Sequence, residues 1–283
     1  MVERKRIYIL AKTYPSISEK YAELVCTAGI LEDGSWIRLY PLRFRQLEKD
    51  LRFSKFSWIE VDVERNMKDV RPESFRPSLN TLIVEPKPQN VNWEERNKTI
   101  FKNTRVFTNL SELIAESKSP ANTSLAIFKP SKITRLEVRK DTPDWDPVKL
   151  AKLQTAAKQI DFFKTKEEVM EEFRVVPKVP YNFYYHFEDD SGKKSTLMIH
   201  DWEIGMLYFN CLKRAGNNES VAIEKVKDKY RDEFLKKDIY FFLGTTLKHH
   251  RRSRNPFTII GVYYPPFPTN DKQMSLFGEE LNG

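Results

Sequence analysis

Residues 200–203 (HDWE) combine residue types and a position that suit acid–base chemistry. They follow a segment that predicts a strand and open the apolar pattern of 202–214, which predicts a helix. A carboxylate at such a junction can act as a general base or stabilise a cationic transition state. Asp201, Glu203 and Glu23 are the candidate catalytic residues, in that order. The structural alternative is that Asp201 caps the helix and that Glu203 interacts favourably with the helix dipole.

Other catalytic and metal-binding patterns are absent from the sequence. It contains no HExxH, P-loop, GxSxG or zinc-deaminase motif, which removes most hydrolase and nucleotide-driven enzyme classes that carry one. Cys26 and Cys211 are the only cysteines and lie far apart, so we expect neither a disulfide framework nor a Cys-based zinc site. The neighbouring His249 and His250 lack the spacing of metal ligands. We therefore expect no metal and no cofactor.

Residues 245–255 carry a dense cluster of positive charge. The segment contains no acidic residue and lies between two apolar patterns that predict strands. Positive charge so concentrated repels itself unless an anion offsets it, and phosphate groups could do so with release of counterions. The alternative is a charged loop that is simply solvated. The candidate nucleic-acid contacts in it are Lys248, His249, Arg251, Arg252 and Arg254.

A second candidate surface comes from a hairpin predicted over residues 23–30 and 36–40, because the join between them contains Asp-Gly. Side chains on the second strand alternate, so that one face is apolar and the other carries Trp36, Arg38 and Tyr40. Flat rings can stack on bases and guanidinium groups can pair with phosphate. The alternative is an amphipathic hairpin with a wet charged face. Further candidate contacts are Lys12, Tyr14, Tyr21, Arg43 and Arg45 near this hairpin and Arg71 and Arg76 on a proline-rich loop, where pairing with carboxylates is the alternative.

Composition agrees with an anionic partner. The 283 residues carry a formal net charge of +8 and have a pI of about 9.2. Nucleic acid is the commonest anionic partner of a soluble protein, and a membrane surface the next. No apolar run is long enough for a signal peptide or a membrane span, so we expect a cytoplasmic protein without membrane attachment.

The order of elements predicts the α+β class, with two β-rich mixed-sheet subdomains, packed helices and a flexible C-terminal tail. The expected subdomains are residues 1–140 and 146–266, and the tail is 267–283. Segment 141–147 (DTPDWDP) separates the subdomains, because its prolines precede a helix start with Asp146 as N-cap. Strands are also predicted at 6–12, 57–64, 79–85, 124–128, 133–139, 181–188, 195–199, 239–244 and 257–264, a loop at 71–77, and helices at 93–107, 110–116, 148–160, 166–173, 202–214 and 219–234.

The tail contains the peptide QMSLF at residues 273–277. It resembles the short peptide by which bacterial DNA polymerases and mismatch-repair proteins bind the ring-shaped sliding clamp. Leu276 and Phe277 would be apolar anchors for a groove on the clamp, and Gln273 would add a hydrogen bond. Met274 stands where Leu is commoner, which is a mild change because Met adapts to the same pocket. The alternative is a segment that folds back onto the domain.

Five short patterns resemble a family of bacterial proteins of similar size. They are KTYP at 12–15, CTAGI at 26–30, WIRLYP at 36–41, DWE at 201–203 and YPP at 264–266. The pattern is also similar to a phage-defence DNA glycosylase that removes glucosylated hydroxymethylcytosine. This resemblance implies double-stranded DNA with modified bases as the partner, and excision of a base to leave an abasic site.

The leading hypothesis is therefore a DNA glycosylase of phage defence or genome maintenance. Such an enzyme swings the nucleotide out of the helix and holds the base between rings, for which Tyr14, Tyr21, Trp36 and Tyr40 are candidates. A carboxylate beside the sugar then stabilises the oxocarbenium character of the breaking bond. The first alternative is a non-catalytic reader of DNA or modified bases that is recruited to the replisome. The second is an RNA-processing protein, against which the clamp-like tail argues.

Overall fold

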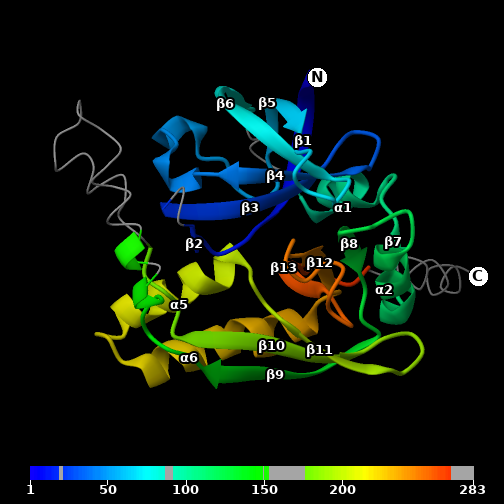
Figure 1. Ribbon diagram of the computed structural model, residues 1–283. Coiled ribbons are helices and arrows are strands. Elements are labelled where there is room, and N and C mark those ends of the chain that lie inside the picture. Colours follow the sequence, from blue (N-terminus) through cyan, green and yellow to red (C-terminus); the bar gives the residue numbers. More distant parts are fainter. Residues whose placement is uncertain (19–21, 87–91, 149, 153–175, 269–283) are drawn as a thin grey trace, which may run out of the picture.

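The computed structural model describes residues 1–18, 22–86, 92–148, 150–152 and 176–268 (Figure 1). Three sheets and four α-helices make up most of it, so the predicted α+β class is confirmed. The strands are β1 (Val2–Lys12), β2 (Ser16–Ser18), β3 (Ala22–Ile30), β4 (Trp36–Leu42), β5 (Trp58–Arg65), β6 (Ser74–Val84), β7 (Val106–Phe107), β8 (Leu125–Phe128), β9 (Lys132–Lys140), β10 (Tyr181–Glu188), β11 (Lys194–Met198), β12 (Tyr240–Thr245) and β13 (Phe257–Tyr263). The α-helices are α1 (Trp93–Phe101), α2 (Leu110–Lys118), α5 (Trp202–Arg214) and α6 (Glu219–Lys227).

The first sheet closes into a barrel. Its strands pair in the order β1-β5-β6-β4-β3, and β3 pairs back to β1, while β2 extends the edge. The predicted hairpin is confirmed, because β3 and β4 pair antiparallel around the Asp-Gly turn. One set of alternating side chains from all five barrel strands forms a single apolar cluster that includes Ile7, Ile37 and Val61. Trp202, the first residue of α5, packs against this cluster beside Phe44.

A four-stranded sheet in the order β13-β12-β8-β7 packs against the outside of the barrel. Phe242 and Ile260 of this sheet join the cluster that contains Leu10 of β1. Their neighbours Phe241 and Ile259 belong to the opposite cluster. Burial on both faces explains why β12 and β13 are apolar almost throughout instead of alternating with polar residues.

The opposite cluster is completed by the three-stranded sheet β11-β10-β9 and by helices α5 and α6. Phe183 and Phe187 of β10 and Tyr208 of α5 are buried there. In Figure 1 the barrel occupies the upper part of the molecule, and the other sheets and the two helices lie below it. Asp201 caps α5 by accepting a hydrogen bond from the Glu203 backbone, so the structural alternative given for this residue is present.

The structure changes several predicted boundaries. Helix α1 ends at Phe101, so the prediction of a helix to residue 107 is wrong. β6 begins at Ser74 inside the predicted loop 71–77, because its pairing with β5 reaches Phe75 and Arg65. Strands from the two sides of segment 141–147 pair with each other, since β9 pairs with β10 and β8 pairs with β12. The helix predicted at 166–173 and most of the one at 148–160 lie outside the described residues. Among the described residues, no helix is long and apolar enough to cross a membrane.

Candidate functional site

The predicted row of Trp36, Arg38 and Tyr40 is not a solvent-facing surface. Arg38 is 1% exposed, and the Trp36 ring packs edge-on against Phe242 of the four-stranded sheet with ring centroids 6.3 Å apart. The other face of β4 fills the barrel, while Trp36 and Tyr40 on this face are half-buried. The expectation of an exposed row is therefore wrong, because a sheet from a distant part of the chain packs on it.

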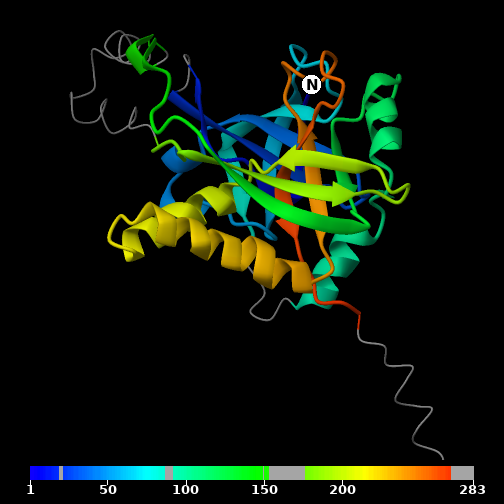
Figure 2. The same ribbon diagram turned by 90° about the horizontal axis from the view of Figure 1, so that it is seen from below.

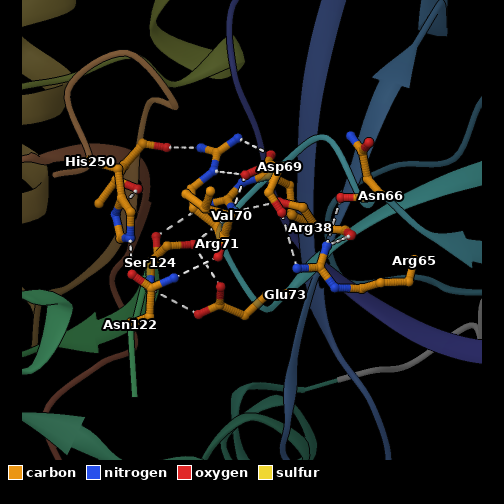
Figure 3. A network of polar contacts seen from close by, with 12 residues as sticks. Arg38, Arg65, Asn66, Asp69, Val70, Arg71, Glu73, Asn122, Ser124 and His250 are labelled. Atoms are coloured by element: carbon orange, nitrogen blue, oxygen red, sulfur yellow. Dashed lines mark hydrogen bonds and ion pairs between the residues drawn. The ribbon is translucent and has the colours of Figure 1, made fainter. Parts of the chain in front are cut away.

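Arg38 is instead the centre of a buried polar network (Figure 3). Its Nη1 donates to the hydroxyls of Ser74 (3.1 Å) and Ser124 (2.7 Å), and its Nη2 donates to the Ser124 carbonyl (3.0 Å). Glu73 accepts from the backbone and the hydroxyl of Ser124. Nε of Arg38 has no hydrogen-bond partner among the described residues, and none of their carboxylates lies within ion-pair distance of the guanidinium. Burial lowers the pKa of Arg38.

Arg71 lies close by in a different environment. It is 4% exposed and pairs with Asp69, whose carboxylate accepts from Nε (2.9 Å) and Nη2 (2.6 Å). Its Nη1 also donates to the Thr245 carbonyl. The sequence left open whether Arg71 contacts phosphate or pairs with a carboxylate, and the structure shows the pair. Asn122 strengthens the same junction, because it donates to the Val70 carbonyl (2.6 Å) and contacts buried His250 (3.0 Å).

These contacts hold two loops side by side, residues 66–73 and residues 246–256 (Figure 2, cyan and orange). The second one, hereafter the basic loop, exposes every one of the predicted contacts on it. Among the described residues, no carboxylate forms an ion pair with its lysine or arginines. The exposed side chains are Lys248, His249, Arg251, Arg252 and Arg254.

A cavity of about 330 Å³ lies between β3–β4 and β12–β13, at the foot of the basic loop. Thr246 and Leu247 form part of its wall, so the cavity and the loop adjoin. Four predicted nucleic-acid contacts come together there, although on the sequence they belong to three separate segments. The wall includes Tyr14, Arg38, Tyr40 and Arg71, with Cys26 and His200.

Two of the candidate carboxylates, Asp201 and Glu203, follow His200 at the start of α5. Asp201 is 1% exposed, and its Oδ2 has no hydrogen-bond partner among the described residues. Lys55 stands between the two acids: its Nζ is 2.9 Å from Oε2 of Glu203 and 3.9 Å from Oδ2 of Asp201, and it donates to the Val262 carbonyl. The Glu203 side chain is 46% exposed. Its carboxylate is therefore the one that solvent or a substrate can reach.

The surroundings shift the pKa values of the Asp201 and Glu203 carboxyls in opposite directions. Burial raises the pKa of the Asp201 carboxyl, and the negative charge of Glu203 raises it further. Burial would also raise the pKa of Glu203, but the charge and the hydrogen bond of Lys55 hold it below its ordinary value. A protonated and an ionised carboxyl side by side are what paired acid and base catalysis needs. No motif marks Lys55 in the sequence, where it stands between Ser54 and Phe56.

A second cavity, of about 350 Å³, adjoins Asp201 on the other side of Tyr14. Tyr14, His200 and Ser16 belong to the walls of both cavities. The Tyr14 ring lies against α5 at Gly205, where a Cβ atom would come within 2.3 Å of the ring. Tyr14 is fixed further by a hydrogen bond from its hydroxyl to the Pro177 carbonyl (2.8 Å). Aromatic side chains in the second wall are Tyr14, Trp145, Tyr181 and Phe183.

The remaining candidate residues are dispersed. Lys12 lies over the Phe44 ring, 3.8 Å from its centroid, and donates to the Phe53 carbonyl. Arg43 and Arg45 are half-buried around the short helix at 44–46, and Arg76 is exposed on β6. Glu23 lies in β3. Tyr21 and the clamp-like residues Gln273, Met274, Leu276 and Phe277 lie outside the described residues.

Within the described ranges, no group of three or more His, Cys, Asp or Glu side chains is placed to hold a metal ion. The described side chains bring together a cationic cavity beside exposed cations, aromatic rings, and a pair of carboxyls whose pKa values are shifted in opposite directions.

The chain belongs to a family described as a domain of unknown function, DUF8757, whose model matches residues 106–281. Residues 3–102 match a second domain of unknown function, DUF8758. No curated protein matches the chain. A solved structure of a murine DNA-binding protein bound to double-stranded DNA aligns with a TM-score of 0.32 and 10% identity, over 95% of this chain and 100% of the other. A likeness at this level does not indicate a shared fold or ligand.

Proposed function

We propose that the protein binds DNA through the basic loop. The observation that carries this proposal is the set of exposed cations on the loop, for which no carboxylate of the described residues compensates. Cations held at a surface in this way attract phosphates and release counterions on binding. Lys118 lies beside them, because its Nζ donates to the Arg254 carbonyl (3.1 Å), and it adds a further positive charge.

The finer proposal is that the protein is a DNA glycosylase acting on a modified base. Water would add to C1′ of the sugar while the bond from C1′ to the base breaks, with its electron pair leaving on the base. Ionised Glu203 would take the proton of the water and stabilise the oxocarbenium character at C1′, and protonated Asp201 would supply a proton to the leaving base. The aromatic wall beside Asp201 would hold the extruded base.

The test is incubation with modified and plain DNA, followed by detection of abasic sites. Asp201→Asn is the sharpest variant, because Asn caps a helix as well as Asp does and only the acid is lost. Glu203→Gln removes the base with a similar shape. We expect abasic sites with the unaltered protein and a loss of about 100-fold or more in each variant. Absence of abasic sites on every modified DNA would refute the glycosylase proposal and leave DNA binding to be judged separately.

A second candidate function is a non-catalytic reader. The burial of Asp201, 1% exposed and engaged as the cap of α5, favours it, because a catalytic carboxylate has to reach its substrate. In that case the DNA is unchanged after incubation, and its affinity is the same for the protein and for Asp201→Asn. The discriminating measurement is thus the abasic-site count combined with a gel shift on the same samples.

We also propose that the QMSLF peptide at 273–277 binds a bacterial sliding clamp. Its resemblance to clamp-binding peptides supports this proposal. A double variant, Leu276→Ala with Phe277→Ala, is expected to abolish capture of the protein by the clamp while its affinity for duplex DNA stays unchanged. Equal capture of both proteins would rule out this role for the peptide.

A further inference from the structure

Arg38 is a buried cation that no carboxylate of the described residues contacts directly, and Glu73 reaches it only through the Ser124 hydroxyl. It is 1% exposed, its Nη atoms donate to neutral oxygens of Ser74 and Ser124, and its Nε has no acceptor among the described residues. A guanidinium stays charged in proteins and offers five N–H donors, so burial without a carboxylate in direct contact and with one donor unused is costly. Arg71 in the same wall shows the usual solution, since Asp69 compensates it.

The cavity beside Arg38 has the size and chemistry of a ligand site. Its volume of about 330 Å³ falls within the range of small-molecule pockets. One part of the wall is cationic, with Arg38 and Arg71, and another is aromatic and apolar, with Tyr14, Tyr40 and Ile260. A ligand that matches both parts has an anionic group joined to a flat ring system.

We propose that this cavity binds one nucleotide, with its phosphate paired to Arg38 and its base among the rings of the wall, and that this nucleotide is a different one from that whose extruded base the second cavity would hold. The inference rests on the proposed function, because the cavity adjoins the basic loop and the nucleotide is taken to belong to the bound DNA. A free nucleoside monophosphate has the same chemistry, so the experiment compares the two sources.

Cys26 reports directly on occupancy of the cavity, because this residue lies in the cavity wall. Cys211, the other cysteine of the chain, lies on α5 outside that wall and serves as an internal control. Both are partly accessible free cysteines. The rate of alkylation by iodoacetamide at each cysteine, followed by mass spectrometry, separates protection of the cavity from a general change in reactivity.

The probes are inorganic phosphate, a deoxynucleoside, the matching deoxynucleoside 5′-monophosphate and duplex DNA. We expect the monophosphate to slow alkylation at Cys26 and to leave Cys211 unchanged. The deoxynucleoside is expected to bind at least about tenfold more weakly, because it lacks the group that pairs with the buried guanidinium. Inorganic phosphate alone is expected to protect more weakly than the monophosphate. Equal binding of deoxynucleoside and monophosphate, or no protection by any probe, would overturn the proposal.

Variants test the role of Arg38 itself. Arg38→Met removes the charge and is expected to abolish protection by the monophosphate, whereas Arg38→Lys keeps a cation and retains part of it. Arg4→Met removes an exposed arginine of the same barrel outside the cavity wall, and it is expected to behave like the unaltered protein. If Arg38→Met does not fold, the comparison of monophosphate with deoxynucleoside on the unaltered protein still decides. Undiminished protection in a folded Arg38→Met would overturn the proposal.

Failure of this inference can be told from failure of the proposed function. If duplex DNA binds but neither it nor the monophosphate protects Cys26, the cavity proposal is overturned and DNA binding stands. If the monophosphate protects Cys26 and duplex DNA does not bind, the cavity takes a free nucleotide and the proposed function is refuted. Protection by both probes supports the two together.

Discussion

Two buried arginines of this protein, Arg71 and Arg38, lie in one cavity wall but have different hydrogen-bond partners. Arg71 has a carboxylate, Asp69, on the same loop, and its third contact ties that loop to Thr245. Arg38 donates only to neutral oxygens, its Nε has no acceptor among the described residues, and Glu73 reaches it through the Ser124 hydroxyl. The comparison suggests a division of roles: the arginine paired directly with a carboxylate holds loops together, and the other keeps a donor for a ligand.

The largest expected effect is the loss of the Asp69–Arg71 pair. Asp69→Ala leaves Arg71 buried without its partner, and such an unpaired charge costs about 3–5 kcal/mol of unfolding free energy. Urea denaturation measures the change. Asp50→Ala removes an exposed carboxylate on the barrel and is expected to stay within about 0.5 kcal/mol. A loss at Asp69 no larger than that of the control would show that the pair does not hold the loops.

Protonation of Asp69 at low pH tests the same pair, with a somewhat smaller expected loss of unfolding free energy. Burial would raise the pKa of Asp69, but the hydrogen bonds and charge of Arg71 lower it to about 2, against an ordinary value of 3.8. A lowered native pKa contributes stability above the unfolded value, and this is lost as pH falls through the native one. We expect Asp69 to contribute on the order of 2 kcal/mol above pH 4, lost toward pH 2.

The measurement is urea denaturation of the protein and of Asp69→Asn from pH 5 to pH 2. Other carboxylates titrate in both proteins, so the difference between the two curves isolates Asp69. We expect this difference to shrink as the pH falls. A difference that is constant over the range would contradict a lowered pKa at this residue.

For Arg38 the comparison predicts a much smaller loss of unfolding free energy than for Asp69. Arg38→Met removes hydrogen bonds to Ser74 and Ser124, and it also removes a buried charge that no described carboxylate contacts directly. The two effects oppose each other, so we expect a change in unfolding free energy of about 1 kcal/mol or less in the absence of ligand. Thermal and urea denaturation check it against Arg71→Met. Equal losses for the two variants would show that Arg38 is as structural as Arg71.

The sequence predicted local features of this site better than its assembly. The Asp-Gly turn between β3 and β4 and the cap of α5 by Asp201 are visible in neighbouring residues, and both are present. The burial of Arg38 was not predictable, because the covering strands come from residues 125–128 and 240–245. An alternating strand shows that its two faces differ, but it does not show that a second sheet covers the polar one. Asp69 could have been paired with Arg71 only once the turn between them was known.

The basic loop completes the comparison, since its arginines are neither buried nor paired with described carboxylates. Removing them is expected to leave stability within about 0.5 kcal/mol and to change only DNA binding. The sharpest variant combines Lys248→Ala, Arg252→Ala and Arg254→Ala. The slope of log affinity against log salt concentration is expected to become shallower by about 0.9 for each phosphate contact that is lost.

Lys213→Ala with Arg214→Ala, which removes two exposed cations on α5, is the matched control. A slope that is unchanged in the loop variant, or that changes equally in the control, would mean that DNA is held elsewhere. The exposed arginines would then be only a solvated surface.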